Sequence, residues 1–261
     1  MRRGVRLGAG LVARAYFDVS YALLTGSAAG CRLLALPAVG GGPVHGYFTN
    51  EDRDVLLTAL RPAPEDLLLD LGSGAGGIAI DLHRRSGAAV RGVDTSPRAV
   101  SAATAGALRA GAEASVRFSV GDLARPPRVG ARCAYAVDSL MFVPDLEPAL
   151  RGIGDVLGSG GRHFATLLVF GAGAESRLLQ AIRAAGADLE RLDDVTPALA
   201  ERSRARAGAA IAQRRGRTTS LRGRLAILLV IAEERLLLRL IAGGRVGRWR
   251  IVVRYAEGAG M

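Results

Sequence analysis

The 261-residue chain contains no lysine, only two cysteines, three histidines and few aromatic residues (5%). Without a lysine it cannot form an internal Schiff base, and it lacks the lysine with which a P-loop holds phosphates. Cys31 and Cys133 lie about a hundred residues apart, so they form neither a disulfide framework nor a metal-binding motif. The histidines are scattered as well, and we predict no metal site.

Long apolar runs are also missing. The longest run in the C-terminal part, residues 225–232, has eight residues, whereas a membrane-spanning helix needs about 20. The N-terminus is similar to a signal peptide only superficially, because Arg6, Arg14 and Asp18 interrupt it. We therefore expect a soluble, cytoplasmic protein. Apolar residues still make up 49% of the chain, which is enough for a sizeable core.

Positive charge is abundant and unevenly placed. All 35 basic residues are arginine, the net charge is +11, and residues 201–261 hold 14 Arg against four acidic residues. Three hypotheses explain this excess: arginines that bind an anionic group of a small acceptor, a phosphate track for nucleic acid, or a solvated face. A nucleic-acid track should contain aromatic residues for base stacking. Residues 201–248 contain no Phe, Tyr or Trp, which argues against nucleic acid.

Short apolar segments alternate with helical segments through the middle of the chain. Strands are predicted at residues 67–71, 88–93, 116–120, 134–137, 163–170, 187–195 and 248–255. Helices are predicted at residues 5–25, 51–60, 78–85, 97–109, 148–157 and 175–185. This alternation is typical of a doubly wound, mainly parallel α/β sheet. We interpret the helical stretch between the last two predicted strands as an insertion into the sheet-forming part of the chain.

The pattern predicts one domain with added segments. Residues 1–60 form an N-terminal helical cap, residues 61–195 the core, residues 196–247 an Arg-rich helical lid, and residues 248–261 the final strand and tail. Along that strand, apolar residues alternate with arginines, so one face carries Arg248, Arg250 and Arg254.

A glycine-rich loop, residues 72–77, follows the first core strand. Its spacing fits both G-x-G-x-G and the dinucleotide fingerprint G-x-G-x-x-G, so the glycines alone leave the ligand open. The nearby carboxylates distinguish the two kinds of ligand. In a parallel sheet the carboxyl ends of the strands line one crevice, and four aspartates are predicted at or near these ends: Asp70, Asp94, Asp122 and Asp138. They would repel a pyrophosphate. They suit a nucleoside that carries an ammonium and a sulfonium group, S-adenosylmethionine, whose hydroxyl and amino groups need acceptors.

With these residues the sequence resembles the class I S-adenosylmethionine-dependent methyltransferases, specifically the small-molecule, ubiquinone-biosynthesis-like branch (methyltransferase type 11). The matching motifs are, in order, residues 70–76, 92–96, 121–123, 138–145 and 156–162. His45-Gly46-Tyr47-Phe48 is similar to the family's H-x-G-Y-type motif, although His and Gly are adjacent here. The resemblance covers residues 45–195 well. It implies a Rossmann-like, seven-stranded sheet with N-terminal helices and a helical lid between the last two strands.

The resemblance also implies site residues. Those expected to bind the cofactor are Asp70, Gly72, Ser73, Gly74, Asp94, Thr95, Asp122, Leu123, Asp138 and Ser139. In the family, the residue at the position of Asp94 holds both ribose hydroxyls. Candidates for the acceptor site are Met141, Phe142, Phe170, Arg214 and Arg217. His45, Tyr47 and Asp138 are candidate catalytic residues, with a cofactor contact or simple packing as the alternative for each.

Methyl transfer is an in-line displacement that needs positioning and exclusion of water, and a base only when the acceptor loses a proton. We therefore predict methyl transfer to a small acceptor, an apolar natural-product or isoprenoid-type metabolite with an anionic or polar group, with S-adenosylhomocysteine as product. The alternatives are a cofactor-binding cyclase or isomerase on the same fold, and an RNA methyltransferase. The sequence leaves open whether the acceptor atom is oxygen, nitrogen or carbon. It also leaves open whether residues 221–241 cover the acceptor or form a homodimer contact.

Overall fold

The structure, a computed structural model, describes residues 18–20, 22–24, 27–34, 46–171, 173–215 and 220–256. Most of the predicted helix at residues 5–25 therefore lies outside the described residues, as do His45 and Arg217.

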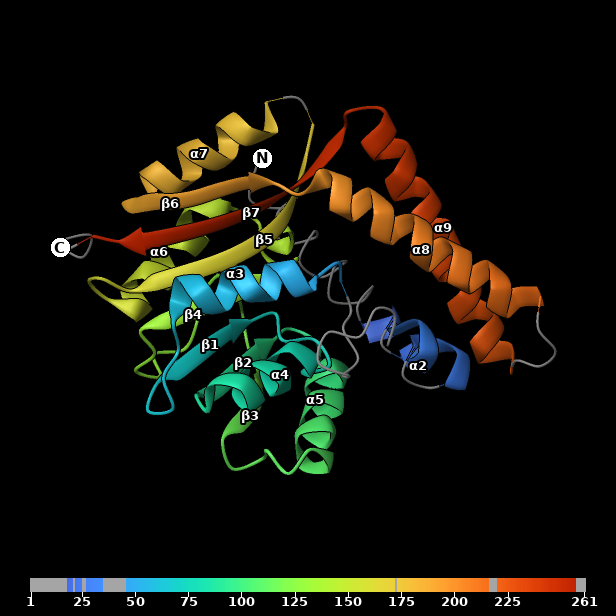
Figure 1. The fold of residues 1–261 in the computed structure, drawn as a ribbon, viewed down its shortest axis with the longest axis horizontal. Coiled ribbons are helices and arrows are strands. Elements are labelled where there is room, and N and C mark those ends of the chain that lie inside the picture. Colours follow the sequence, from blue (N-terminus) through green and yellow to red (C-terminus); the bar gives the residue numbers. More distant parts are fainter. Residues whose placement is uncertain are drawn as a thin grey trace, which may run out of the picture.

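Within the described residues, seven strands form a single sheet in the order β3-β2-β1-β4-β5-β7-β6 (Figure 1). The strands are β1 (Leu67–Leu71), β2 (Ala89–Asp94), β3 (Val116–Val120), β4 (Cys133–Val137), β5 (Arg162–Phe170), β6 (Ala187–Asp194) and β7 (Val246–Tyr255). β1 to β5 pair in parallel, and β7 pairs antiparallel with both β5 and β6. The predicted fold class, a mainly parallel seven-stranded sheet with a reversed last strand, is confirmed.

Helices cover both faces of this sheet (Figure 1). They are α2 (Ala28–Leu34), α3 (Asn50–Leu60), α4 (Gly77–Ser86), α5 (Pro97–Arg109), α6 (Leu146–Leu157), α7 (Ala174–Ala184), α8 (Thr196–Arg215) and α9 (Leu221–Ala242). α3, α4 and α5 pack on the face that carries Leu68 and Val90. α6 and α7 pack on the face that carries Leu69 and Leu71. Alternate residues of β1 thus pack into two separate hydrophobic cores, which explains why the sequence of β1 is almost continuously apolar.

The helix ends follow local chemistry. Ser96 caps α5 by accepting the Ala99 N–H, with Pro97 as its first residue, as predicted. Thr49 and Asp52 form a reciprocal capping box at the start of α3. α6 was predicted to begin at Pro148, but it begins at Leu146, because its first turn already includes that proline.

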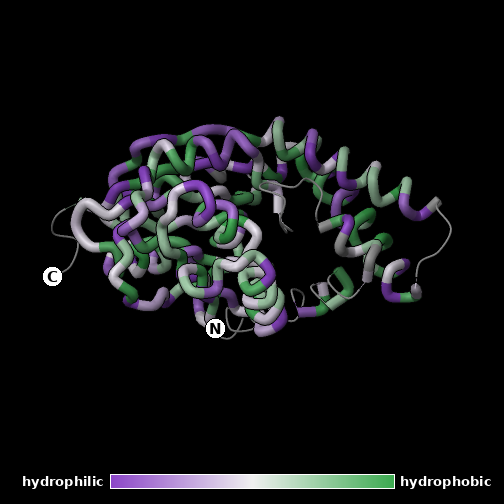
Figure 2. Tube along the Cα trace, turned by 60° about the horizontal axis from the view of Figure 1, so that its bottom comes forward, coloured by the Kyte–Doolittle hydropathy of each residue, from purple (hydrophilic) through white to green (hydrophobic). Residues whose placement is uncertain are grey.

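α8 and α9 lie between β6 and β7 in the chain, where the helical insertion was predicted. They form an antiparallel pair that extends beyond the edge of the sheet, and α2 lies against its far part (Figure 1). Leu24 and Leu33 pack there against Ala210, Ile227 and other buried residues of the pair. In Figure 2, hydrophilic and hydrophobic residues alternate along both helices. None of the helices in the described residues is long and apolar enough to cross a membrane.

Candidate functional site

The glycine loop leaves β1 and turns into α4 at the carboxyl end of the sheet. Gly72 and Ser73 donate their N–H groups to the Val93 carbonyl, at 2.8 and 3.1 Å, which fixes the loop against β2. Gly72 has φ 87°, and a Cβ atom there would lie 2.3 Å from the Ser139 Cβ. Only glycine therefore fits at this position.

Asp94 ends β2 directly beside this loop. Its carboxylate accepts the N–H groups of Gly74 and Ser96, each at 2.9 Å. Burial raises the pKa of Asp94, and the nearby Asp18 carboxylate adds to the rise, while the backbone N–H groups lower it. The Ser96 hydroxyl donates to Asp18, so the N-terminal helical segment reaches the same crevice.

Asp122 and Leu123 follow β3 at the same end of the sheet. Asp122 is exposed and accepts the Ala124 N–H at 2.9 Å, while Leu123 is buried. Gly121 donates to the Asp94 carbonyl at 3.0 Å, which holds the two strand ends together. Asp94 and Asp122, both predicted to bind the cofactor, therefore lie at neighbouring strand ends. Thr95, half-buried, lies in the turn after Asp94.

Asp70 and Ser73 are buried polar residues at the base of the crevice. Among the described residues, the Asp70 Oδ2 atom and the Ser73 Oγ atom have no hydrogen-bond partner. Burial raises the pKa of Asp70 to about 8; the nearby Tyr135 hydroxyl opposes the rise, and the charge of Asp94 adds to it. A buried polar atom without a partner is costly. Both atoms thus suit a cationic or hydrogen-bonding ligand in the crevice.

Asp138 follows β4, as predicted, but its carboxylate is fully engaged. Its Oδ1 accepts Arg248 Nε at 2.8 Å, and its Oδ2 accepts the Tyr47 N–H at 2.9 Å and Arg248 Nη2 at 3.3 Å. The next residue, Ser139, donates its hydroxyl to the Leu71 carbonyl at 2.5 Å. Both carboxylate oxygens of Asp138 are therefore engaged, and its predicted catalytic role stays a prediction.

The partners of Asp138 belong to a larger set of paired charges, here called the buried ion cluster: Asp52, Asp138, Arg248 and Arg250. Arg248 also donates to Asp52 at 3.1 Å, and Arg250 donates to Asp52 at 3.2 Å. Arg248 is fully buried. Burial alone would lower the pKa of Arg248, but Asp138 and Asp52 raise it above its usual value. The cluster ties α3, the end of β4 and β7 together.

Tyr47 connects this cluster to the helical insertion. Its hydroxyl donates to Glu234 of α9 at 3.1 Å. Arg206 of α8 lies 5.5 Å from the Tyr47 ring centre, a cation–π distance, and 3.2 Å from the Glu234 carboxylate. Ser203 donates to Glu234 at 2.6 Å. Burial, followed by the Glu234 charge, raises the pKa of Tyr47, so the phenol stays protonated.

Arg202 lies one helical turn before Arg206 on the same side of α8. Its Nε and Nη2 atoms are buried, and neither has a hydrogen-bond partner among the described residues. Burial, followed by the charge of Arg248, lowers the pKa of Arg202 to about 10. The described part of the chain therefore presents an inward-facing guanidinium that is available to an anion.

An apolar cluster adjoins these charges. It consists of Leu168, Leu199, Leu237 and Val246, with Tyr47, Met141, Leu240 and Ile241 packed against it. Met141, predicted for the acceptor wall, therefore lies in this β5–α9 apolar cluster. Phe142 and Phe170 are exposed, at the ends of the 3-10 helix η1 (Leu140–Phe142) and of β5. The structure brings Tyr47 and Met141 together but leaves both phenylalanines outside the cluster.

Arg214, one of the two arginines predicted to bind the acceptor, is not part of this arrangement. Arg214 is exposed in the last turn of α8, at the end away from the sheet, and Arg217 is outside the described residues. His45 is also outside them, so its predicted role stays a prediction.

Sequence reasoning missed five residues that the fold brings to the site: Asp52, Arg202, Arg206, Glu234 and Arg248. Asp52 reads as a helix-capping residue, and it does cap α3. The two α8 arginines read as members of a basic run. One signal was available, because Glu234 stands in the apolar stretch 225–241, where a buried carboxylate needs a partner.

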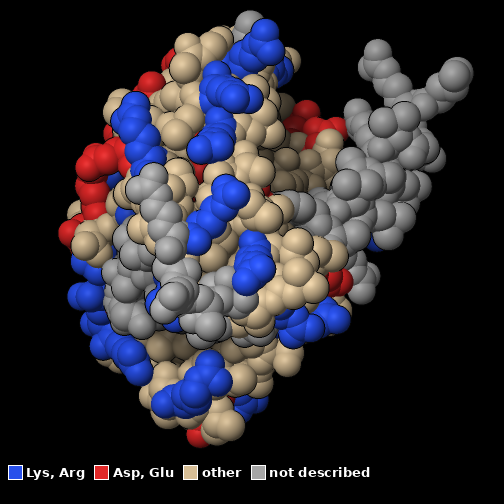
Figure 3. All heavy atoms as spheres, turned by 90° about the vertical axis from the view of Figure 1, so that its right-hand side faces the viewer, with Lys and Arg blue, Asp and Glu red and all other residues tan. Residues whose placement is uncertain are grey.

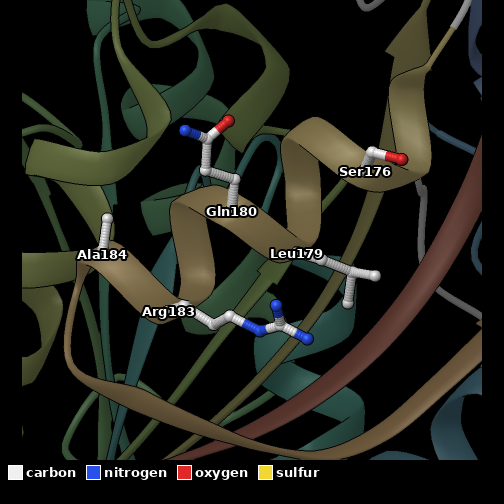
Figure 4. Close-up of a pocket in the computed structure, with 5 residues that line it drawn as sticks. All are labelled: Ser176, Leu179, Gln180, Arg183 and Ala184. Carbon is white, nitrogen blue, oxygen red and sulfur yellow. The ribbon is translucent and has the colours of Figure 1, made fainter.

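A surface depression on the outer side of α7 is unrelated to these residues. Ser176, Leu179, Gln180, Arg183 and Ala184 line it, and all five lie on one helix (Figure 4). No catalytic or cofactor-binding candidate is among them.

Comparison with known proteins agrees with this geometry. Residues 68–161, the glycine loop and the adjoining strands, match the family described as "Methyltransferase domain". No curated protein matches the chain. This match and the order of the strands support the predicted resemblance to the class I S-adenosylmethionine-dependent methyltransferases.

Solved structures share the fold over most of the chain. The [4+2]-cyclase SpnF is 24% identical, with a TM-score of 0.69, over 87% of this chain and 95% of its own. Geranyl diphosphate C-methyltransferase from Streptomyces coelicolor A3(2) is 20% identical, with a TM-score of 0.61, over 79% of each chain. Phosphoethanolamine N-methyltransferase 2 from Haemonchus contortus is 15% identical, with a TM-score of 0.71, over 87% of this chain and 57% of its own.

Proposed function

We propose that the protein transfers a methyl group from S-adenosylmethionine to a small, largely apolar acceptor that carries an anionic group. The observation that carries this proposal is a series of neighbouring groups that hydrogen bonds and side-chain contacts link at the carboxyl end of the sheet. Unpartnered acceptor atoms lie beside the glycine loop, followed by the buried ion cluster, the β5–α9 apolar cluster and the unpartnered guanidinium of Arg202.

The glycine-loop end fits the cofactor. Asp94 and Asp122 supply carboxylate oxygens for hydroxyl and amino groups, and each now accepts only backbone N–H groups among the contacts described. Asp70 and Ser73 offer buried acceptor atoms for an ammonium group. When bound, S-adenosylmethionine supplies an activated methyl carbon on its sulfonium. The protein therefore needs to position the acceptor and exclude water.

The other end of the crevice fits the acceptor. Met141 and Tyr47 border the β5–α9 apolar cluster, which gives an apolar molecule a wall. Arg202 adds a planar guanidinium suited to a carboxylate or phosphate oxygen. The Tyr47 hydroxyl stays protonated and donates a hydrogen bond to Glu234. We therefore expect Tyr47 to be a fixed part of the acceptor wall and not a base. An acceptor that must lose a proton would need a base from elsewhere, and His45 remains our candidate.

A second function deserves a direct test because the structural neighbour SpnF is a [4+2]-cyclase. A cyclase on this fold would bind the cofactor and convert its substrate without losing the methyl group. The two functions are separated by incubating the protein with a metabolite extract and methyl-labelled S-adenosylmethionine. Methyl transfer predicts a labelled product and an equal amount of S-adenosylhomocysteine. A changed metabolite with no label would replace our proposal with the cyclase.

Cofactor binding at neutral pH should release a proton. In the free protein the pKa of Asp70 is about 8, so at pH 7 this carboxyl is mostly protonated. A cation bound against it favours the charged form and lowers the pKa below 7. We expect a net release approaching one proton, measured by calorimetry in buffers of different ionisation enthalpy. The Asp70→Asn variant should show no such release, and an unchanged value in that variant would disprove the assignment.

The anionic group of the acceptor should depend on Arg202. With the labelled product identified, Arg202→Gln is expected to raise the KM for its precursor by about tenfold or more, since charge-assisted hydrogen bonds contribute about 1.5–3 kcal/mol. The matched control is Arg204→Gln, an exposed arginine two residues further along α8. Equal kinetics for the two variants would exclude Arg202 from acceptor binding.

A further inference from the structure

The outward side of α9 carries an apolar stripe. Leu221, Leu225, Leu228 and Leu236 are 75%, 47%, 46% and 58% exposed. Together with exposed Ala232 they recur every three or four residues, which places them on one side of the helix. The opposite side, with Ala226, Val230 and Leu237, is buried against the rest of the protein. α9 is therefore apolar on both sides, although only one of them is packed.

Arginines border this stripe. Arg222, Arg224, Arg235 and Arg239 are exposed on α9, and Arg204 and Arg214 are exposed on the adjacent α8. α8 and α9 together contain nine arginines and three acidic residues, of which Glu234 is buried and Glu233 is half-buried. Figure 3 views the molecule from the end where these two helices project. Blue basic groups are scattered there over a largely uncharged surface.

We propose that this stripe and its bordering arginines dock the protein on an anionic membrane surface, with α9 lying in the plane of the interface. Leucines at helical spacing with arginines at their border are the composition of interfacial helices. The leucines would enter the acyl boundary while the guanidinium groups contact anionic headgroups.

The positive charge beside the stripe favours an anionic membrane over a second copy of the chain as its partner. Two α9 stripes packed on each other would bring Arg224 and Arg235 of both copies together. No side chain of α9 that the structure describes as exposed is acidic, so the described face offers no partner for these charges. An anionic bilayer supplies both the apolar phase and the opposite charge.

The docked orientation also agrees with the location of the site. The inward side of the same helix contributes Glu234, Leu237 and Ile241 to the site and to the β5–α9 apolar cluster. An apolar acceptor dissolved in a bilayer would thus be one helix diameter away. The docking inference itself rests on the outer surface alone and holds whatever reaction the protein catalyses.

Vesicle flotation tests the proposal with the full-length protein. Wild-type protein should bind vesicles of phosphatidylcholine containing about one third phosphatidylglycerol at least tenfold more strongly than vesicles of pure phosphatidylcholine. Leu225→Gln/Leu228→Gln should lose at least tenfold of this binding. Leu108→Gln, at a 64% exposed leucine on α5, should keep it. Circular dichroism and the thermal midpoint verify that each variant is folded.

The charge requirement is tested separately. Arg224→Gln/Arg235→Gln should weaken binding more than Arg84→Gln/Arg109→Gln, which removes the same charge from exposed positions on α4 and α5. The proposal is overturned if folded wild-type protein stays unbound at low salt, or if all variants bind alike. It is also overturned if light scattering shows a dimer that the leucine variant dissociates.

Discussion

Replacing Asp94 by alanine is expected to weaken S-adenosylmethionine binding by about tenfold or more. The carboxylate offers charged acceptor oxygens beside the glycine loop, and hydrogen bonds to a charged group contribute about 1.5–3 kcal/mol each. It also holds the Gly74 and Ser96 N–H groups at 2.9 Å, so its loss loosens the loop that approaches the ligand. Isothermal titration calorimetry measures the change directly.

Two variants separate the loss of ligand contacts from a general loss of structure. Asp94→Asn keeps one acceptor oxygen and should bind with intermediate affinity. Asp188→Ala removes an exposed carboxylate from β6, away from the crevice, and should bind as wild type. Unchanged affinity in Asp94→Ala would remove this residue from the cofactor site.

Replacing Arg248 by methionine is expected to lower the free energy of unfolding by about 3–5 kcal/mol. The substitution leaves the Asp138 carboxylate, 2.8 Å from a lost nitrogen atom, buried without a cationic partner, and Asp52 keeps only Arg250. An unpaired buried charge costs much more than the intact pair contributes. Urea unfolding gives the difference from the shift in midpoint.

The matched control lies on the same strand and the same face. Arg254 pairs with Glu190 at 3.3 Å, but its side chain is 51% exposed, so Arg254→Met should cost no more than about 1 kcal/mol. The double variant Arg248→Met/Asp138→Asn should recover part of the lost stability, because it removes one of the stranded charges. Equal losses in the two single arginine variants would show that the cluster does not stabilise the fold.

The core of the fold could be predicted because its signals are local. Each strand from β1 to β5 is a short apolar segment that ends at glycine or a polar residue, and each was predicted to within one residue of its observed bounds. Ser96 and Pro97 marked the start of α5 for the same reason. The glycine loop and Asp94 were found because both follow directly from where β1 and β2 end.

The acceptor side could not be predicted in the same way, because its partners are far apart in the sequence. The hydrogen bond from Arg248 to Asp138 spans 110 residues, and the one from Tyr47 to Glu234 spans 187. The basic run contains no local signal that distinguishes Arg202 from Arg214 and Arg217.

The sequence by itself determined the sheet, the glycine loop and the carboxylates at the strand ends, since strand ends and turn residues are encoded locally. It also determined that every fixed positive charge is an arginine, because the chain has no lysine. Only the tertiary structure decided which of these charges are neutralised. Arg248 and Arg250 are paired because β7 inserts between β5 and β6 and faces α3. Arg202, on α8, has two nitrogen atoms that find no hydrogen-bond partner among the described residues. A net charge gives the number of arginines, and the contacts between distant segments decide which of them remain available for a ligand or a surface.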